Sequence, residues 1–165
     1  MAITRLGGAN AISGTIPAAN VATLTSSNLP SGTVVQTVSS GEATQSTINS
    51  TSYVLAISLA ITPSTSSNKI YIKFDGQYMQ DDSDGASSHT KLTKTISATE
   101  TTIFDTFTGR DFSGGAISWS PNFGYLDSPN TTSEVTYKIY GRTTNSSSDW
   151  RIREQTILNA FEIKG

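Results

Sequence analysis

The run Tyr53-Val54-Leu55-Ala56-Ile57-Ser58-Leu59-Ala60-Ile61 decides the fold class of this chain. A large apolar side chain recurs at every second position of the run, and Pro63 follows shortly after it. Residues two apart share one face of a β-strand, so this period predicts a strand with one face turned toward a core. Pro63 lacks the N–H that a ladder hydrogen bond needs, and it therefore marks the end of the strand.

Other runs on both sides repeat the β pattern. They are rich in β-branched and aromatic residues, and clusters of turn-forming residues separate them. The runs are 33–38, 69–74, 90–96, 102–107, 116–126, 134–140 and 156–163. No stretch has the period of an amphipathic helix. About eight short strands within residues 31–165 predict an all-β fold, an eight-stranded jelly-roll sandwich.

The last of these runs is apolar on both faces. Ile157, Phe161 and Ile163 alternate with Leu158 and Ala160. A monomer seldom leaves a contiguous apolar patch open to water, and closed symmetry between copies would bury it. We therefore expect Ile157, Leu158, Phe161 and Ile163 to form an interface in a homo-oligomer.

Residues 1–30 differ from the rest of the chain. They hold three glycines, two prolines and a single charge, Arg5, and they follow neither a period of two nor one of 3.6. This predicts an extended N-terminal arm that cannot form its own core, with a disordered tail as the alternative. Scattered aliphatic residues favour an arm that docks on a partner. The expected partner-binding residues are Ile3, Leu6, Ile12, Ile16, Val21 and Leu24.

The composition limits the classes of function. Only 15% of the 165 residues are charged and the net charge is -2, whereas 25 are Ser and 25 are Thr. Nucleic-acid binding needs a basic stripe and membrane-surface binding needs a basic patch, so we expect neither partner. There is no cysteine and thus no thiolate metal site. The opening residues lack the apolar run of a signal peptide, which leads us to expect synthesis and assembly in a cytoplasm.

Several segments, taken in order, resemble structural proteins of bacteriophage particles. Residues 2–8 (Ala2-Ile3-Thr4-Arg5-Leu6-Gly7-Gly8) and 12–21 are similar to N-terminal linkers of phage tail-fibre and virion proteins. Residues 29–38 resemble the first strand of a domain frequent in phages of aquatic bacteria, including cyanobacteria. Residues 125–133 (Tyr125-Leu126-Asp127-Ser128-Pro129-Asn130-Thr131-Thr132-Ser133), followed by Val135-Thr136-Tyr137-Lys138, look like its most recognisable block. Ala160-Phe161-Glu162-Ile163 is similar to its final strand.

The resemblance implies a virion structural role and a trimeric jelly roll of the tumour-necrosis-factor-like kind. It carries over no catalytic residue, and it does not distinguish the head of the particle from the tail. It departs from tail fibres in one respect, because such a domain usually ends a long shaft, whereas here it nearly fills the chain.

Metal and catalytic sites are weakly indicated. Asp81, Asp82 and Asp84 precede Gly85 and could supply oxygen ligands to calcium, but no later Glu completes the loop, and turn geometry alone explains such residues. His89 is the only histidine, too few for zinc, and no nucleophile motif accompanies it. Asp75, Glu100 and Asp105 could be imagined as a glycosidase pair, yet carboxylates on β-sandwiches usually face solvent. We expect no enzyme activity and no cofactor.

Two tryptophans are candidates for surface contacts. Trp is favoured at interfaces and can stack on sugars. Trp150 has Arg151 and Arg153 beside it, and Trp119 lies in another predicted strand. Ordinary packing at the start of a strand is the alternative for Trp150.

Together these features predict a capsid decoration or cement protein. The arm would lie across capsid subunits, and trimers would bind between capsomers and stabilise the head by multivalent contact with the major capsid protein. The alternative is a tail-tip or tail-fibre head that contacts other tail proteins and binds a host surface glycan. Either way the protein would be located in the virion, after assembly in the host cytoplasm.

Overall fold

The computed structural model describes residues 28–75, 78–81, 87–110, 117–119 and 122–165. The chain divides into two units, Met1–Pro30 and Ser31–Gly165, and every described strand belongs to the second. The six arm residues expected to bind a partner, Ile3, Leu6, Ile12, Ile16, Val21 and Leu24, lie outside the described residues. No helix in the described part of the chain is long and apolar enough to span a membrane.

The described strands form three antiparallel sheets of four strands each. One sheet has the order β1 (Val34–Glu42), β12 (Ile157–Ile163), β4 (Lys69–Asp75), β9 (Phe123–Asp127). A second has the order β3 (Val54–Ile61), β10 (Val135–Thr143), β6 (Ser87–Ile96), β7 (Thr99–Arg110). The third has the order β2 (Ser46–Ile48), β11 (Asp149–Ile152), β5 (Tyr78–Asp81), β8 (Ile117–Trp119).

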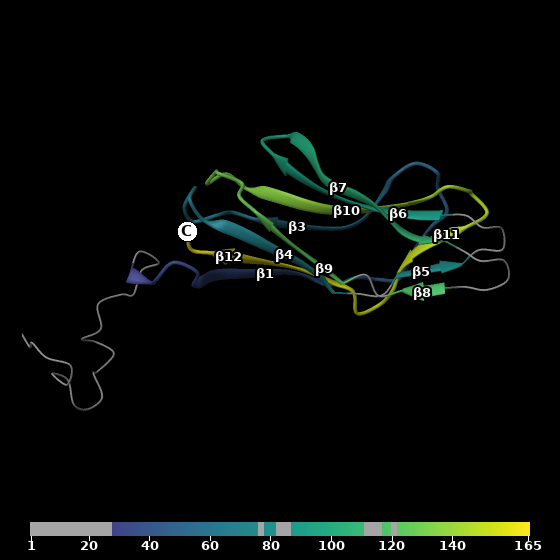
Figure 1. Ribbon diagram of the computed structural model, residues 1–165, viewed down its shortest axis with the longest axis horizontal. Coiled ribbons are helices and arrows are strands. Elements are labelled where there is room, and N and C mark those ends of the chain that lie inside the picture. Colours follow the sequence, from purple (N-terminus) through teal and green to yellow (C-terminus); the bar gives the residue numbers. More distant parts are fainter. Residues whose placement is uncertain (1–27, 76–77, 82–86, 111–116, 120–121) are drawn as a thin grey trace, which may run out of the picture. The chain divides into compact units, whose positions relative to one another are not determined.

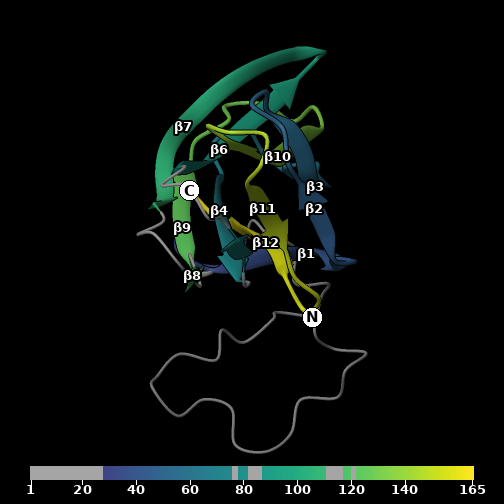
Figure 2. The same ribbon diagram turned by 90° about the vertical axis from the view of Figure 1, so that its right-hand side faces the viewer.

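The first and third sheets correspond strand by strand. Along the chain β1 is followed by β2, β4 by β5, β8 by β9 and β11 by β12, and these pairs keep the same neighbours in both sheets. If each pair is counted as one interrupted strand, eight strands remain, in the orders first–eighth–third–sixth and second–seventh–fourth–fifth. This is the strand order of a jelly roll. The prediction of an all-β, eight-stranded jelly-roll sandwich is therefore confirmed, and Figures 1 and 2 show β10, β6 and β7 layered over β1 and β12.

The core lies between the two layers. The burial of β10, β12 and β4 alternates residue by residue, so each strand sends every second side chain inward. The buried apolar residues are Ile48, Leu59, Ile61, Ile70, Ile72, Phe74, Leu92, Val135, Tyr137, Ile139, Trp150, Ile152, Leu158 and Ala160.

A buried carboxylate holds the segment between β3 and β4 against the last strand. Glu162 of β12 is fully buried, and its Oε1 accepts hydrogen bonds from Ser64 N at 2.6 Å and from Ser64 Oγ at 2.7 Å. Asn68 Nδ2 donates to the same oxygen at 2.7 Å. Charge-assisted hydrogen bonds of this kind offset the cost of burying the carboxylate.

Candidate functional site: the two outer faces of the sandwich

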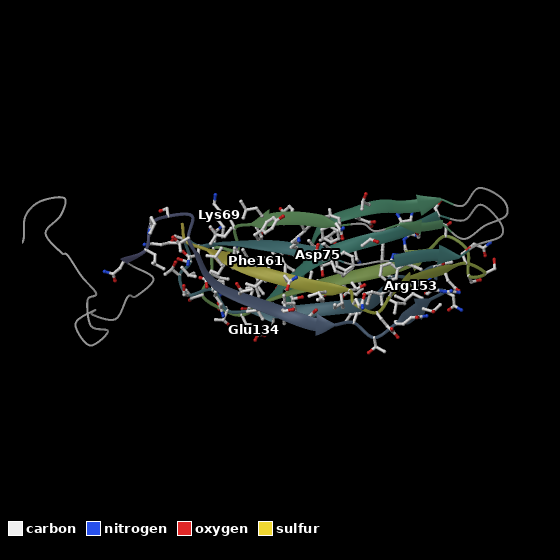
Figure 3. The ribbon with its side chains drawn as sticks, turned by 90° about the horizontal axis from the view of Figure 1, so that it is seen from below. Lys69, Asp75, Glu134, Arg153 and Phe161 are labelled. Carbon is white, nitrogen blue, oxygen red and sulfur yellow. The ribbon has the colours of Figure 1, made fainter. Side chains whose placement is uncertain are left out.

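The outer face of the β1-β12-β4-β9 sheet carries apolar side chains mainly on β12, whereas the neighbouring central strand β4 turns Lys69, Lys73 and Asp75 outward beside Tyr71. Cross-strand pairing places Ile163 beside Val34, and Phe161 beside Tyr71, which in turn pairs with Leu126. We call Val34, Tyr71, Leu126, Ile157, Phe161 and Ile163 the apolar face. Val34 and Leu126 are 51% and 49% exposed, and the others are partly exposed. Figure 3 shows Phe161 between Lys69 and Asp75, which stand at the two ends of β4.

The structure separates the residues that the sequence assigned to an oligomer interface. Ile157, Phe161 and Ile163 point outward, as the interface requires. Leu158 was wrongly assigned to it, because this residue is 0% exposed and belongs to the core. The physical reason is the pleat of β12, which sends neighbouring residues to opposite faces of the sheet.

The outer face of the β3-β10-β6-β7 sheet carries a different chemistry. Lys91 of β6 places its Nζ 4.2 Å from the ring centroid of Tyr53 and 4.9 Å from that of Tyr140. Arg142 of β10 holds its Cζ 5.0 Å from the Tyr53 centroid. The Tyr53 hydroxyl donates a hydrogen bond to Asp105 of β7. We call Tyr53, Lys91, Asp105, Tyr140 and Arg142 the tyrosine–cation cluster.

A β-bulge brings Tyr53 and Leu55 to this outer face. Ile57 pairs with Ile139, but the next pair is Leu55 with Tyr140, so the register shifts by one residue at Ala56. A shift of one residue reverses the faces of a strand. Ile57, Leu59 and Ile61 therefore point toward the core, whereas Leu55 is 47% exposed even though it continues the same alternation in the sequence.

Several side chains on this face contact carboxylates of β7. Partial burial raises the pKa of the Tyr53 hydroxyl, and the hydrogen bond to Asp105 raises it further, so Tyr53 stays a neutral donor. Lys138 Nζ lies 2.8 Å from Glu100 Oε2 and holds the pKa of Glu100 below its usual value. His89 Nδ1 is 3.7 Å from Asp105 Oδ1.

Trp150 is not a surface residue, contrary to its assignment as a surface contact. It is 1% exposed, and its Nε1 donates to Thr90 Oγ1 at 3.1 Å. Gly141 makes room for the indole, because a Cβ at that position would overlap the ring. The alternation of β11 turns Trp150 inward and leaves Arg151 partly exposed, where its Nη2 binds Asp149 Oδ2 at 2.5 Å.

The other predicted positions are only partly covered by the structure. Arg153 is partly exposed and follows β11 (Figure 3). Trp119 ends β8, and its side chain lies outside the described residues. Asp81 ends β5, and its side chain also lies outside the described residues. Asp82 and Asp84 lie entirely outside them. Within the described part, no group of three or more metal-ligating side chains is found.

The carboxylates considered as a catalytic pair are divided between the two layers. Asp75 lies on the outer side of β4 and pairs with Lys73, at 2.8 Å between Lys73 Nζ and Asp75 Oδ2. Glu100 and Asp105 both belong to β7 in the other layer.

Sequence reasoning did not find the tyrosine–cation cluster. Its members come from strands far apart in the chain, and only the pairing of β10 with β6 and β3 brings them together. The sequence did contain one signal for these cations. Lys91 and Arg142 occupy alternate positions of strands with a period of two, and this pattern predicts that both side chains lie on the solvent-facing side of their strands.

The strand order defines the class of the protein as a jelly-roll β-sandwich with one apolar and one tyrosine- and cation-bearing outer face. No protein-family model matches the chain, and no curated protein matches its sequence.

Among solved structures the chain is similar to proteins of infectious bursal disease virus particles. The T13 viral particle matches at 15% identity and a TM-score of 0.48, over 79% of this chain and 31% of that one. The Gt strain structure matches at 11% identity and a TM-score of 0.44, over 78% of this chain and 37% of that one. The chain thus spans about a third of the length of these viral chains.

Proposed function

We propose that this protein is a non-enzymatic structural subunit of a virus particle, specifically a phage capsid decoration protein that forms trimers and binds between capsomers. The jelly-roll strand order supports the proposal, because viral capsid domains are among the proteins that use it. The resemblance of residues 125–138 to a phage virion domain points the same way.

The apolar face carries this proposal. Phe161 sits on β12, a central strand with a neighbour on each side, and its ring lies 6.2 Å from that of Tyr71. Water-exposed faces of sandwich sheets are normally polar along such a strand, since alternation keeps apolar residues for the core. Burial of this face against a second copy would remove the apolar surface from water.

Attachment to the particle is assigned to residues 1–30. An arm with scattered aliphatic residues can add to a sheet edge of the major capsid protein and fill small apolar pockets. Ordering such an arm costs entropy, so each arm binds weakly, and three arms on one trimer recover the affinity.

Self-association is the first testable consequence. The intact protein is expected to run in light scattering at three times its chain mass of 17.5 kDa. Phe161→Glu and Leu126→Glu each place a charge on the apolar face and should shift the mass toward the monomer. Leu126 is half exposed, so its replacement tests the interface without disturbing the core.

The matched control is Leu55→Glu, which makes the same change on the other sheet. This variant should stay trimeric. An intact protein that is monomeric at micromolar concentration would contradict the proposal, as would equal dissociation by all three variants. Copy number then separates head from tail, since hundreds of copies per particle indicate a decoration protein and a small multiple of three a tail protein.

A further inference from the structure

The tyrosine–cation cluster contains two cations outside ion-pair distance of a carboxylate in the described residues, although Asp105 faces Lys91 across the β6–β7 pair. Neither Lys91 nor Arg142 forms an ion pair with a carboxylate of the described residues, although Lys73, Lys94, Lys138 and Arg151 each do. Arg142 Nε is buried, and no atom of the described residues forms a hydrogen bond with it. Buried N–H groups normally donate a hydrogen bond, so this guanidinium nitrogen lacks an acceptor.

The two cations are held in place rather than free to move. The ring of Tyr53 lies within cation–π distance of both, and Tyr140 holds Lys91 from a second side. Asp105 faces Lys91 across the β6–β7 pair and offsets part of this charge, but its carboxylate accepts a hydrogen bond from the Tyr53 hydroxyl and forms no ion pair with either cation. Two cations held on the ring of Tyr53, neither in an ion pair with a carboxylate, form a preorganised site for an anionic group.

The surroundings of this pair include an apolar and an aromatic side chain, and the Tyr140 hydroxyl donates to Glu100 Oε2 at 3.2 Å. Leu55, 47% exposed, is paired with Tyr140 on the neighbouring strand. A ligand that fits must offer a carboxylate or sulfate to the cations and a C–H surface to Tyr140 and Leu55. Acidic saccharides combine the two, since a pyranose ring has an apolar face and its acid group projects from the rim.

We propose that the outer face of β3, β10, β6 and β7 binds an acidic saccharide. Arg142 and Lys91 bind its acid group, and Tyr140 and Leu55 contact the face of the sugar ring. The site lies in the opposite layer from the apolar face. The assignment does not depend on the virion role or on trimer formation.

The test measures binding of a fluorescently labelled galacturonate hexasaccharide to the full chain by polarisation. We expect saturable binding that weakens at least about tenfold in Arg142→Gln and in Lys91→Gln, because each variant loses a charge-assisted contact. Arg142→Lys should retain a larger part of the affinity than Arg142→Gln. Lys73→Gln removes the same charge from the opposite layer and should bind like the intact protein.

Two further ligands define what is recognised. The methyl-esterified hexasaccharide should bind at least about tenfold more weakly, and inorganic sulfate should not displace the labelled sugar at equal concentration. Equal binding of the ester would overturn the role of the cations, and efficient displacement by sulfate would leave an anion site without sugar recognition. Absence of saturable binding, or an equal loss in Lys73→Gln, would also overturn the proposal. Self-association, measured separately by mass, does not affect these outcomes.

Discussion

At the scale of single residues, Asp127 ties the two layers of the sandwich together. It belongs to β9 and is 5% exposed. Its two carboxylate oxygens lie 2.7 and 2.9 Å from Lys94 Nζ of β6, and the Tyr137 hydroxyl of β10 donates to it at 2.8 Å. Burial, and then the negative charge of Asp127, raise the pKa of Tyr137 far above its usual value, so the phenol remains a hydrogen-bond donor.

Asp127→Asn is expected to lower the free energy of unfolding by about 3 kcal/mol, because it leaves the mostly buried Lys94 ammonium without its counter-charge. Urea denaturation followed by circular dichroism measures the change. The double variant Asp127→Asn/Lys94→Met removes both charges and should recover much of the loss. If the double variant loses as much stability as the single variants Asp127→Asn and Lys94→Met added together, the residues do not act as a pair.

At the scale of elements, the hairpin between β6 and β7 is closed by two residues with unfavourable backbone angles. Ser97 and Ala98 have φ values of 48° and 67°, and Ile96 pairs with Thr99 across the turn. A two-residue loop with both φ values positive is a type I′ turn, which matches the twist of the strands but favours Asn and Gly. Ala98 therefore adopts a conformation that costs an L-residue about 1 kcal/mol.

Ala98→Gly is expected to raise the melting temperature by about 2–4 °C, since glycine reaches a positive φ without steric cost. The matched change Ala60→Gly lies in the exposed part of β3 and should lower the melting temperature, because glycine weakens a strand. Thermal unfolding of the two variants and the intact protein, measured under the same conditions, gives the three melting temperatures to compare. A decrease for Ala98→Gly would mean that the turn tolerates alanine without strain.

At the scale of the whole molecule, all described strands lie between Val34 and Ile163, within the unit Ser31–Gly165. The backbone closes this unit near its ends, where Gly32 N donates to Lys164 O at 2.8 Å and Lys164 N donates to Thr33 O at 2.9 Å. The described strands of this unit supply all eight strands of the two jelly-roll layers.

Deletion of residues 1–30 should leave the sandwich folded and the number of chains in each oligomer at three, and it should abolish attachment to particles. The truncated and full-length proteins are added separately to particles that lack this protein, and the bound fraction is measured after sedimentation. Equal binding of the two would assign attachment to the sandwich itself and remove the arm from the proposal.

The amino-acid sequence by itself determined the fold class and the polarity of most strands. The period-two alternation of 69–74, 134–140 and 156–163 is a local property, and the pleat of one strand converts it directly into an inner and an outer face. This is why Ile157, Phe161 and Ile163 could be placed on one face of their strand, although the sequence did not show that this face is the outer one, and why an eight-stranded sandwich followed from counting such runs.

Only the tertiary structure decided which residues meet. The bulge at Ala56 turns Tyr53 and Leu55 outward although their alternation is unbroken, and Trp150 enters the core because Gly141 of the neighbouring strand leaves space for it. Lys91 and Arg142 gather on Tyr53 through the register of strands that are distant in the chain. Register depends on packing between strands, and a period read along one strand contains no information about its neighbours.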